Sequence, residues 1–381
     1  MLSSTPVALT VTTLLDDPIT LIPGQTTLRD AINQADTGTG NQYVIKFAVN
    51  GTIHLTTSAL PDLHNNIFIA GPRASKLTVQ RDSSAVPFSV FTVDSGVTVS
   101  LSGMTIAGGS ADSGGGMNNS GTLTIIGCDF DDNSTSPLTS SSDAYGGGIY
   151  SFGTLTIIGS SFRDNSASPP PGYTGGLGGA ICSNGTLSII GSTFDHNFAS
   201  SNGGAIVSVG GLTIMGSTFN ANSSNSGGAI WNVLGSLKVT DSIFDHNSAV
   251  GGGGSGIYNT STATVIGSIF DANSGYTGGG IDNNGGTLTV IFSIFHDNSA
   301  LIDGGGIYNY NGGTATVVGS IFVANSAQEN GGGMYNLGTL TVTGSVFDGN
   351  SASLGGGIYN AGTLSYTGNL FFDNTGGDIY S

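Results

Sequence analysis

Aspartate and histidine recur at one fixed place in this sequence, between a phenylalanine and an asparagine. The Phe-x-x-Asn element occurs ten times, and the residue after the phenylalanine is often acidic, as at Asp245 and Asp271. Carboxylates on neighbouring repeats could coordinate Ca²⁺ or serve as the acid and base of a glycoside hydrolase. Asp245 and Asp271 belong to consecutive repeats, so they are the candidate ligands for Ca²⁺, the one cofactor that the sequence suggests.

Several observations favour a structural interpretation of these residues. Aspartate is a common turn residue, and duplication of a repeat would copy it into every turn. His196 and His246 are two repeats apart, at about 10 Å, which is too far for their imidazoles to share a metal ion. A lyase acting on an anionic polymer would need basic side chains, and after Arg81 the chain contains only Arg163 and Lys238. A solvated acidic corner is therefore expected ahead of an ion site, and an ion site ahead of catalysis.

A row of aromatic residues follows an apolar position that we expect to be interior. Exposed rings can stack on sugar rings, or they can stack on one another and stabilise the sheet. Both interpretations stay open, and Trp231 and Tyr258 are the candidate glycan-binding residues of the row. Its members are Tyr150, Trp231, Tyr258, Tyr308, Tyr335, Tyr359 and Tyr380.

Two early repeats are longer than the others because they carry insertions at residues 134–145 and 166–177. Adjacent insertions on a regular repeat protein often form its binding face. We therefore expect any specific ligand or partner to contact these loops. The candidate contact residues are Tyr145, Tyr173, Asp143 and Arg163.

A Thr-x-Thr pattern recurs between the turns, as at Thr287 and Thr289. Such an array resembles the flat face of ice-binding β-helices. Threonine is equally a good residue for an exposed strand, and Gly211 and Lys238 interrupt the row. Ice binding is therefore a third hypothesis, behind adhesion and glycan binding.

The composition indicates a folded, acidic repeat protein. The 381 residues include 65 glycines, but 38% are hydrophobic and these recur at fixed places, which argues against low-complexity disorder. The net charge is −17, and the sequence has no basic cluster that could neutralise phosphates or anionic lipids. We therefore expect no nucleic-acid partner and no direct insertion into a membrane.

The repeat has a period of 24–27 residues, except for two early coils of 32. Within it, apolar and polar residues alternate in short runs bounded by Gly, Asn and Ser, which predicts short strands with one buried face. Propeller blades need about twice this period, and the repeat has no helical spacing. The sequence therefore predicts an all-β fold, a right-handed parallel β-helix (solenoid) of about a dozen three-stranded coils.

Stacking of such coils predicts columns of like residues. Leucines such as Leu155 and isoleucines such as Ile157 should line the interior, beside a column of the Phe-x-x-Asn phenylalanines. The asparagines of these elements should link coil to coil at one corner. Residues 111–381 form this regular part, and residues 1–110 form an N-terminal cap and irregular first coils.

The two ends of the predicted β-helix differ. One short helix is predicted over residues 27–35, with Leu28, Ile32 and Ala35 on one face and a threonine cap at its start. We expect this helix to cover the open end of the first coils. The last coil has no such cap, and we expect it to be available for self-association. Cys128 and Cys182 fall in different columns, so a disulfide between them is not expected.

With these motifs, residues 100–381 resemble the GGAI/FxxN repeats of chlamydial polymorphic membrane proteins and the wider class of bacterial right-handed parallel β-helix repeat proteins. The repeat reads GGGIYN at residues 304–309 and FHDN at residues 295–298. The early segment TTLRDAINQAD, at residues 26–36, resembles the SLRDAI segment that opens many secreted bacterial β-helix proteins. The resemblance implies a secreted or cell-surface passenger, often adhesive, with no catalytic residues to carry over.

These observations together favour a non-catalytic, extracellular or cell-surface structural or adhesive β-helix. The alternative is a carbohydrate-active protein that binds or hydrolyses neutral glycans, so whether the chain is an enzyme stays open, with the weight against it. Expected partners are a glycan or a cell-surface molecule and a second copy of the chain. The location is inferred from the resemblance, because the first residues lack the basic region of a secretory signal peptide.

Overall fold

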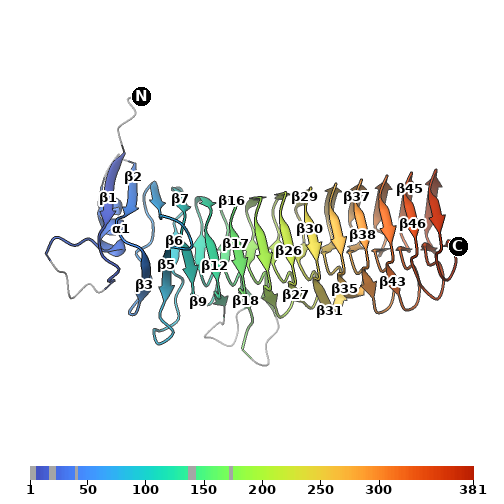
Figure 1. Ribbon diagram of the computed structural model, residues 1–381, viewed down its shortest axis with the longest axis horizontal. Coiled ribbons are helices and arrows are strands. Elements are labelled where there is room, and N and C mark those ends of the chain that lie inside the picture. Colours follow the sequence, from blue (N-terminus) through green and yellow to red (C-terminus); the bar gives the residue numbers. More distant parts are fainter. Residues whose placement is uncertain (1–5, 17–22, 39–41, 136–142, 171–174) are drawn as a thin grey trace. The chain divides into compact units, whose positions relative to one another are not determined.

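The computed structural model describes residues 6–16, 23–38, 42–135, 143–170 and 175–381. It divides into two compact units, Met1–Ser188 and Ile189–Ser381, which we call the N-terminal and the C-terminal unit. In both units, short strands from consecutive coils pair in parallel, and the described residues contain a single helix. The predicted all-β parallel β-helix of about a dozen coils, with one short helix, is therefore confirmed (Figure 1).

The N-terminal unit begins with the helix and the first coil. The helix α1 (Leu28–Thr37) lies against β1 (Val7–Val11) and β2 (Tyr43–Phe47). A capping box starts it, because the Thr27 side chain accepts from the Asp30 N–H and the Asp30 carboxylate accepts from the Thr27 N–H. The predicted helix is thus present, and it extends two residues beyond its predicted end. The buried residues of its predicted apolar face are Leu28, Ile32 and Ala35.

Parallel sheets form the walls of the N-terminal unit. The first contains β1, β2, β4 (Ile67–Ala70), β7 (Thr98–Ser102), β11 (Thr122–Ile126) and β16 (Thr154–Ile158). The second contains β6 (Phe91–Val93), β10 (Met117–Asn119), β15 (Ile149–Ser151) and β20 (Ile181–Ser183). The third contains β3 (Gly51–Leu55), β5 (Leu77–Arg81), β8 (Thr105–Ala107), β12 (Asp129–Asp131) and β17 (Ser161–Arg163). The shortest strands are β9 (Ser110–Ala111), β13 (Ser134–Thr135), β18 (Ser166–Ala167), β14 (Ala144–Tyr145) and β19 (Gly176–Leu177).

The C-terminal unit repeats four sheets regularly. The first contains β25 (Leu212–Met215), β29 (Ser236–Thr240), β33 (Thr262–Ile266), β37 (Thr287–Ile291), β41 (Thr314–Val318), β45 (Thr339–Thr343) and β48 (Thr363–Thr367). The second contains β24 (Ile206–Ser208), β28 (Ile230–Asn232), β32 (Ile257–Asn259), β36 (Ile281–Asn284), β40 (Ile307–Tyr310), β44 (Met334–Asn336), β47 (Ile358–Asn360) and β50 (Ile379–Tyr380). The third contains β22 (Thr193–Asp195), β26 (Thr218–Asn220), β30 (Ile243–Asp245), β34 (Ile269–Asp271), β38 (Ile294–His296), β42 (Ile321–Val323), β46 (Val346–Asp348) and β49 (Leu370–Phe372). The fourth contains β23 (Phe198–Ala199), β27 (Ser223–Ser224), β31 (Ser248–Gly253), β35 (Ser274–Thr277), β39 (Ser299–Ala300) and β43 (Ser326–Ala327). The strand β21 (Thr186–Ile190) includes the residues on both sides of the division between the units.

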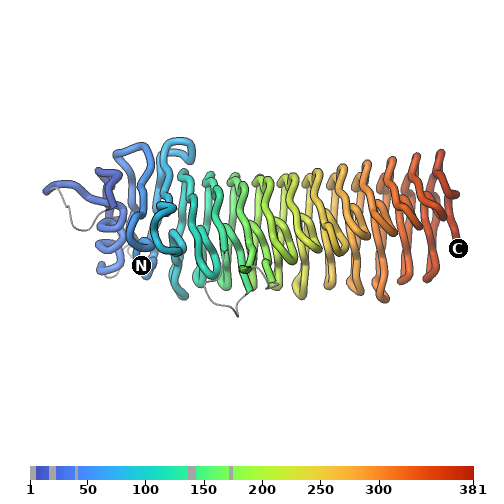
Figure 2. The backbone as a smooth tube through the Cα atoms, turned by 90° about the horizontal axis from the view of Figure 1, so that it is seen from below, coloured from blue at the N-terminus to red at the C-terminus, as the bar shows by residue number. Residues whose placement is uncertain are grey.

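Most regular coils therefore have a fourth strand beside the three that the sequence predicts. It is short and follows the asparagine of the Phe-x-x-Asn element directly, where the sequence often reads Ser-Ala. Figure 2 shows these coils following one another in the C-terminal unit. The strand is easily missed in sequence, because two residues give no visible alternation.

The interior of the C-terminal unit contains the predicted columns of like side chains. The phenylalanines from Phe194 to Phe371 stack coil on coil, with ring centroids 4.7–5.0 Å apart and nearly parallel planes. Leu212 and Leu237 are buried beside Ile214 and Val239. In the N-terminal unit Phe130 and Phe162 stack in the same way, at 4.7 Å. Like residues in register bury the apolar surface without gaps, which is what a long solenoid core needs.

The asparagines of the Phe-x-x-Asn elements form the predicted ladder. Asn247 is typical, because its amide Nδ2 donates to Asn273 Oδ1 at 3.0 Å and to the Phe219 carbonyl at 2.9 Å. Its Oδ1 in turn accepts from both the N–H and the Nδ2 of Asn222. These amides are fully buried, so each rung satisfies backbone groups that would otherwise lack a partner.

Two further ladders were not predicted. The asparagine that ends the GGGIYN motif or its variants, such as GSGIYN, donates its Nδ2 to the equivalent Oδ1 of the next coil, as from Asn259 to Asn283 at 2.7 Å. A buried serine at a third corner accepts from the backbone N–H of the preceding coil, as Ser268 does from Ser242 at 3.2 Å. Both residue types recur at fixed spacing in the sequence, so these two ladders could have been predicted from it. The polar residues that repeat most faithfully thus bind coil to coil.

Candidate functional site

The pair of residues between the phenylalanine and the asparagine of each element forms an exposed corner of the C-terminal unit, which we call the turn ridge. The second residue of the pair has a left-handed backbone, with φ of 51° at His246 and 52° at Asp297. This conformation is uncommon, and Asp, Asn and His tolerate it better than most residues. The turn can therefore account for Asp and His at the second position, although Ala221, Ala272 and Ala324 adopt the same conformation there, and it does not account for the aspartates of the first position. The pairs of the ridge are 195–196, 220–221, 245–246, 271–272, 296–297, 323–324, 348–349 and 372–373.

The candidate Ca²⁺ ligands Asp245 and Asp271 lie on this ridge, in register on neighbouring strands. Each carboxylate contacts a different histidine. Asp245 Oδ1 is 2.5 Å from His246 Nδ1, and Asp271 Oδ1 is 2.7 Å from His296 Nδ1. Both carboxylates are partly exposed, as a solvated acidic corner requires. Ca²⁺ binding by this pair stays a prediction.

His296 joins two carboxylates into the densest cluster of ionisable groups described on the ridge. Its Nδ1 faces Asp271, and its Nε2 lies 3.5 Å from Asp297 Oδ2. One ligand atom from each of the three residues lies within 4.8 Å of the others. The hydrogen bond to Asp271 and the charge of Asp297 raise the pKa of His296. The sequence signal was the order His-Asp, which reverses the Asp-His order of residues 195–196 and 245–246.

The aromatic row behaves differently in its two halves. Tyr308, Tyr335 and Tyr359 stack face to face, with centroids 4.9–5.0 Å apart, and Tyr380 continues the stack at 5.2 Å. Rings stacked in this way cover one another's faces, so the self-stacking interpretation describes this half. Trp231 and Tyr258, the candidate glycan contacts, are 6.5 Å apart and tilted by 50°.

The tilt between the Trp231 and Tyr258 rings does not distinguish glycan binding from self-stacking for these two residues. Their role as glycan contacts stays a prediction.

Asp282 occupies a position of the aromatic row and is almost fully buried, with 2% of its surface exposed. Thr277 Oγ1 donates to Asp282 Oδ2 at 3.0 Å, while Asp282 Oδ1 has no partner among the described residues. Burial raises the pKa of Asp282 to about 7. The sequence shows an aspartate where other coils have an aromatic residue, but only the structure shows that this carboxyl is covered.

The candidate contacts at the insertions lie in the N-terminal unit. Tyr145 donates to Asp143 Oδ2 at 2.9 Å and stacks on Tyr150 with centroids 5.2 Å apart. Desolvation and the bond to Asp143 raise the pKa of Tyr145 to about 12, so its phenol stays protonated at neutral pH. Arg163 lies exposed at the end of β17, and Tyr173 falls outside the described residues. The structure thus brings Tyr145 and Asp143 together, and a ligand at this place stays a prediction.

The threonine pairs lie on the outer face of the first sheet. Thr287, Thr314 and Thr339 align in register, and so do the threonines two residues further along each strand. The middle residue of each pattern is buried and the threonines are not. This alternation is what any exposed strand shows. Ice binding stays a prediction as well.

Comparison with known families gives one match in sequence. A model of the Chlamydia polymorphic membrane protein repeat matches residues 191–209 and 344–361. The chain is thus a β-helix repeat protein that resembles the chlamydial polymorphic membrane proteins. A search of curated proteins gives no match. No helix of the described residues is long and apolar enough to cross a membrane.

Several solved structures are similar at low identity. The A-module of the mannuronan C-5 epimerase AlgE6 from Azotobacter vinelandii has 13% identity over 91% of this chain and 93% of that one, with a TM-score of 0.37. A PL6 alginate lyase in complex with a trisaccharide has 11% identity over 89% and 80%, with a TM-score of 0.40. The Dettilon tailspike protein has 14% identity over 90% and 64%, with a TM-score of 0.36. At these values the similarity carries no information on activity.

Proposed function

We propose that this chain is a non-catalytic structural or adhesive protein of the cell surface or extracellular space. The observation that carries the proposal is the role of the polar positions that recur within the repeat. The buried asparagines and serines that recur in coil after coil form hydrogen-bonded ladders between neighbouring coils. What they stabilise is a regular surface that other molecules can contact.

The exposed ionisable groups offer little for acid–base catalysis. A glycosidase needs two carboxylates held on either side of the scissile bond, one of them protonated. On the turn ridge, Asp245 and Asp271 contact histidines and are open to solvent. Asp282 is a carboxyl with a raised pKa, but it is covered and has no exposed carboxylate partner described beside it. These features support binding or structure over bond cleavage.

The resemblance to chlamydial polymorphic membrane proteins supports a surface location. The composition fits it too, because 24 acidic and 7 basic residues keep the chain from binding nucleic acids or anionic lipids non-specifically. An acidic β-helix suits a display role, since its core of stacked side chains is continuous from coil to coil. Cys128 and Cys182 are both buried, free thiols.

Two assays on the whole chain test the proposal together. Beads coated with the chain should adhere to cultured cells in a saturable manner that soluble chain competes, while albumin-coated beads should not. The same preparation should release neither reducing ends nor unsaturated products from neutral and anionic polysaccharides. Product release that is lost in Asp245→Asn or Asp271→Asn would establish catalysis and overturn the proposal. Absence of competed adhesion would remove the adhesive role.

A further inference from the structure

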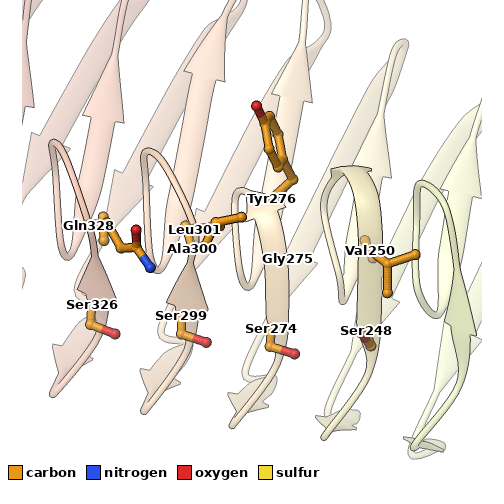
Figure 3. Close-up of a pocket in the computed structure, with 12 residues that line it drawn as sticks. Ser248, Val250, Ser274, Gly275, Tyr276, Ser299, Ala300, Leu301, Ser326 and Gln328 are labelled. Atoms are coloured by element: carbon orange, nitrogen blue, oxygen red, sulfur yellow. The ribbon is translucent and has the colours of Figure 1, made fainter.

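A groove crosses four consecutive coils of the C-terminal unit, at the strands β31, β35, β39 and β43. It has a volume of about 420 Å³, and we call it the serine groove. Figure 3 shows its two walls, with a row of serines along one side and larger side chains along the other. The serines are Ser248, Ser274, Ser299 and Ser326. The opposite wall consists of Val250, Tyr276, Leu301 and Gln328.

The local sequence explains why a groove forms here. In these four coils, the Phe-x-x-Asn element is followed by serine, then alanine or glycine, and then a larger residue. The small residue is buried, as at Ala249 and Ala300, so no side chain fills the space above it. The serines of neighbouring coils are in register, which aligns the serine wall over four coils. The groove therefore runs across the strands, from coil to coil.

The side-chain polar atoms of this groove have no hydrogen-bond partner among the described residues, whereas its backbone groups are paired, as the Gln328 carbonyl is with Ser353 Oγ. The unpaired side-chain groups are the hydroxyls of the four serines, the Tyr276 phenol and the Gln328 carboxamide. Tyr276 is 41% exposed, so a face of its ring is open to a ligand. None of the lining residues is charged, although the chain as a whole carries a net charge of −17. The groove is thus an uncharged place on an acidic protein.

The geometry points to a neutral, linear glycan as the ligand of the serine groove, lying along the row of coils. Hydroxyls repeat at about 4.8 Å along the groove, which is close to the length of one sugar ring. Serine hydroxyls and the Gln328 amide can both donate to and accept from sugar hydroxyls. The Tyr276 ring, with Leu301 and Val250, can cover the apolar faces of the sugars. This inference rests on the proposed adhesive function and names the class of its partner.

A peptide is a poorer fit than a glycan. Extended peptides usually bind by adding a strand to an open sheet edge, where backbone groups are free. The backbone of β35 is paired with a strand on each side, so the groove offers side chains alone. An anionic glycan is a poorer fit too, because the groove has no basic residue and the surrounding field is negative.

The test measures binding of defined hexasaccharides to the whole chain by titration calorimetry. The probes are cellohexaose, xylohexaose and mannohexaose, with hexagalacturonate as the anionic control. At least one neutral probe should bind with a Kd in the micromolar to low millimolar range, and hexagalacturonate should not. If none of the three neutral probes binds at millimolar concentration, the inference is wrong.

Two matched pairs of variants place the binding. Tyr276→Ala should weaken the binding of that probe about five- to tenfold, whereas Phe292→Ala, which removes a 68% exposed ring outside the groove, should leave it unchanged. Ser299→Glu should abolish binding by adding bulk and negative charge, and Thr289→Glu on the first sheet should not. Unchanged melting temperatures in all four variants would show that the fold is intact. Equal effects of a groove variant and its control would contradict the assignment.

The same variants separate this inference from the proposed function. If Tyr276→Ala and Ser299→Glu lose glycan binding and bead adhesion together, both stand. If wild-type beads adhere and the two groove variants adhere equally well, the groove is not the adhesive surface, while the adhesive function is kept. If a neutral peptide pool binds and Tyr276→Ala abolishes that binding, the ligand is a peptide and the glycan class is wrong. Hydrolysis of a bound hexasaccharide would overturn the proposed function itself.

Discussion

The turn ridge and the serine groove are two rows of exposed side chains in the same C-terminal unit, and they differ in what their polar atoms contact. On the ridge, charged groups contact one another, as His296 does with Asp271 and Asp297. In the groove, uncharged hydroxyls repeat in register without a partner in the described structure. Both rows come from the same repeated duplication. Repetition alone therefore does not mark a binding surface, and we propose the groove as one because its aligned hydroxyls lack partners and its lining is uncharged.

Both rows depend on the asparagine ladder beneath them, and breaking it should have the largest effect. Asn247→Ala removes the acceptor of two buried donors of Asn222 and one donor of the Phe219 carbonyl. We expect the free energy of unfolding to fall by about 4 kcal/mol, measured by urea unfolding. The control is Asn220→Ala, which removes a partly exposed amide of the ridge and should cost less than about 1 kcal/mol. Equal losses would contradict the structural role of the ladder.

Asp282 does not fit the comparison of the turn ridge with the serine groove, because it is an ionisable residue that belongs to neither. Its folded pKa of about 7 lies above the ordinary value of 3.8, so between these values the folded state holds a proton that the unfolded state has released. Stability due to this group is therefore present below pH 3.8 and is lost as pH rises toward 7. From pH 5 to pH 8 the wild type should lose roughly 3 kcal/mol through this group, and Asp282→Asn should remove that loss.

The measurement for Asp282 is the free energy of unfolding at each pH, for wild type and variant in parallel. Asp348→Asn, on the ridge, is the matched control and should follow the wild-type profile. A variant at position 282 whose pH profile matches the wild type would show that the buried carboxyl does not titrate as described.

Removal of serine hydroxyls tests whether the groove, and not the turn ridge, binds the glycan. Ser274→Ala with Ser299→Ala should weaken binding of the neutral hexasaccharide about five- to tenfold, because each hydroxyl contributes a modest hydrogen bond. Asp348→Asn should change that affinity less than about twofold, since no ridge residue lines the groove. Calorimetric titration measures both. A larger effect at the ridge would move the binding surface there.

The smallest effect is expected at His296. Its raised pKa means that its contribution to stability is present below pH 6.5 and is lost as pH rises through the folded value. The side chain is 46% exposed, so solvent screening should keep this contribution below about 1 kcal/mol. His296→Ala should therefore reduce only slightly the change in the free energy of unfolding between pH 6 and pH 8. A change of several kcal/mol would mean that the ridge is structural after all.

The fold could be predicted to a large extent, whereas the candidate sites could be predicted only in part. The phenylalanines, the paired leucines and isoleucines and the asparagine ladder all follow from spacing, because each occupies the same position in every coil. The helix was predictable from Thr27 and the apolar residues Leu28 and Ile32. The groove was missed, since serine and alanine after a turn look like loop residues until four coils lie side by side.

By itself, the sequence determined which residues face inward, because side chains alternate along each strand and the repeat copies that alternation. It also determined the net charge of −17, from which we expect no nucleic-acid partner. Only the tertiary structure decided which outward residues meet. Asp271 and His296 are 25 residues apart and touch because their coils stack in register, and Asp282 is buried because neighbouring segments cover it. Contacts between unlike residues of neighbouring coils depend on the exact register and on the path of the loops, which the sequence of a single coil does not encode.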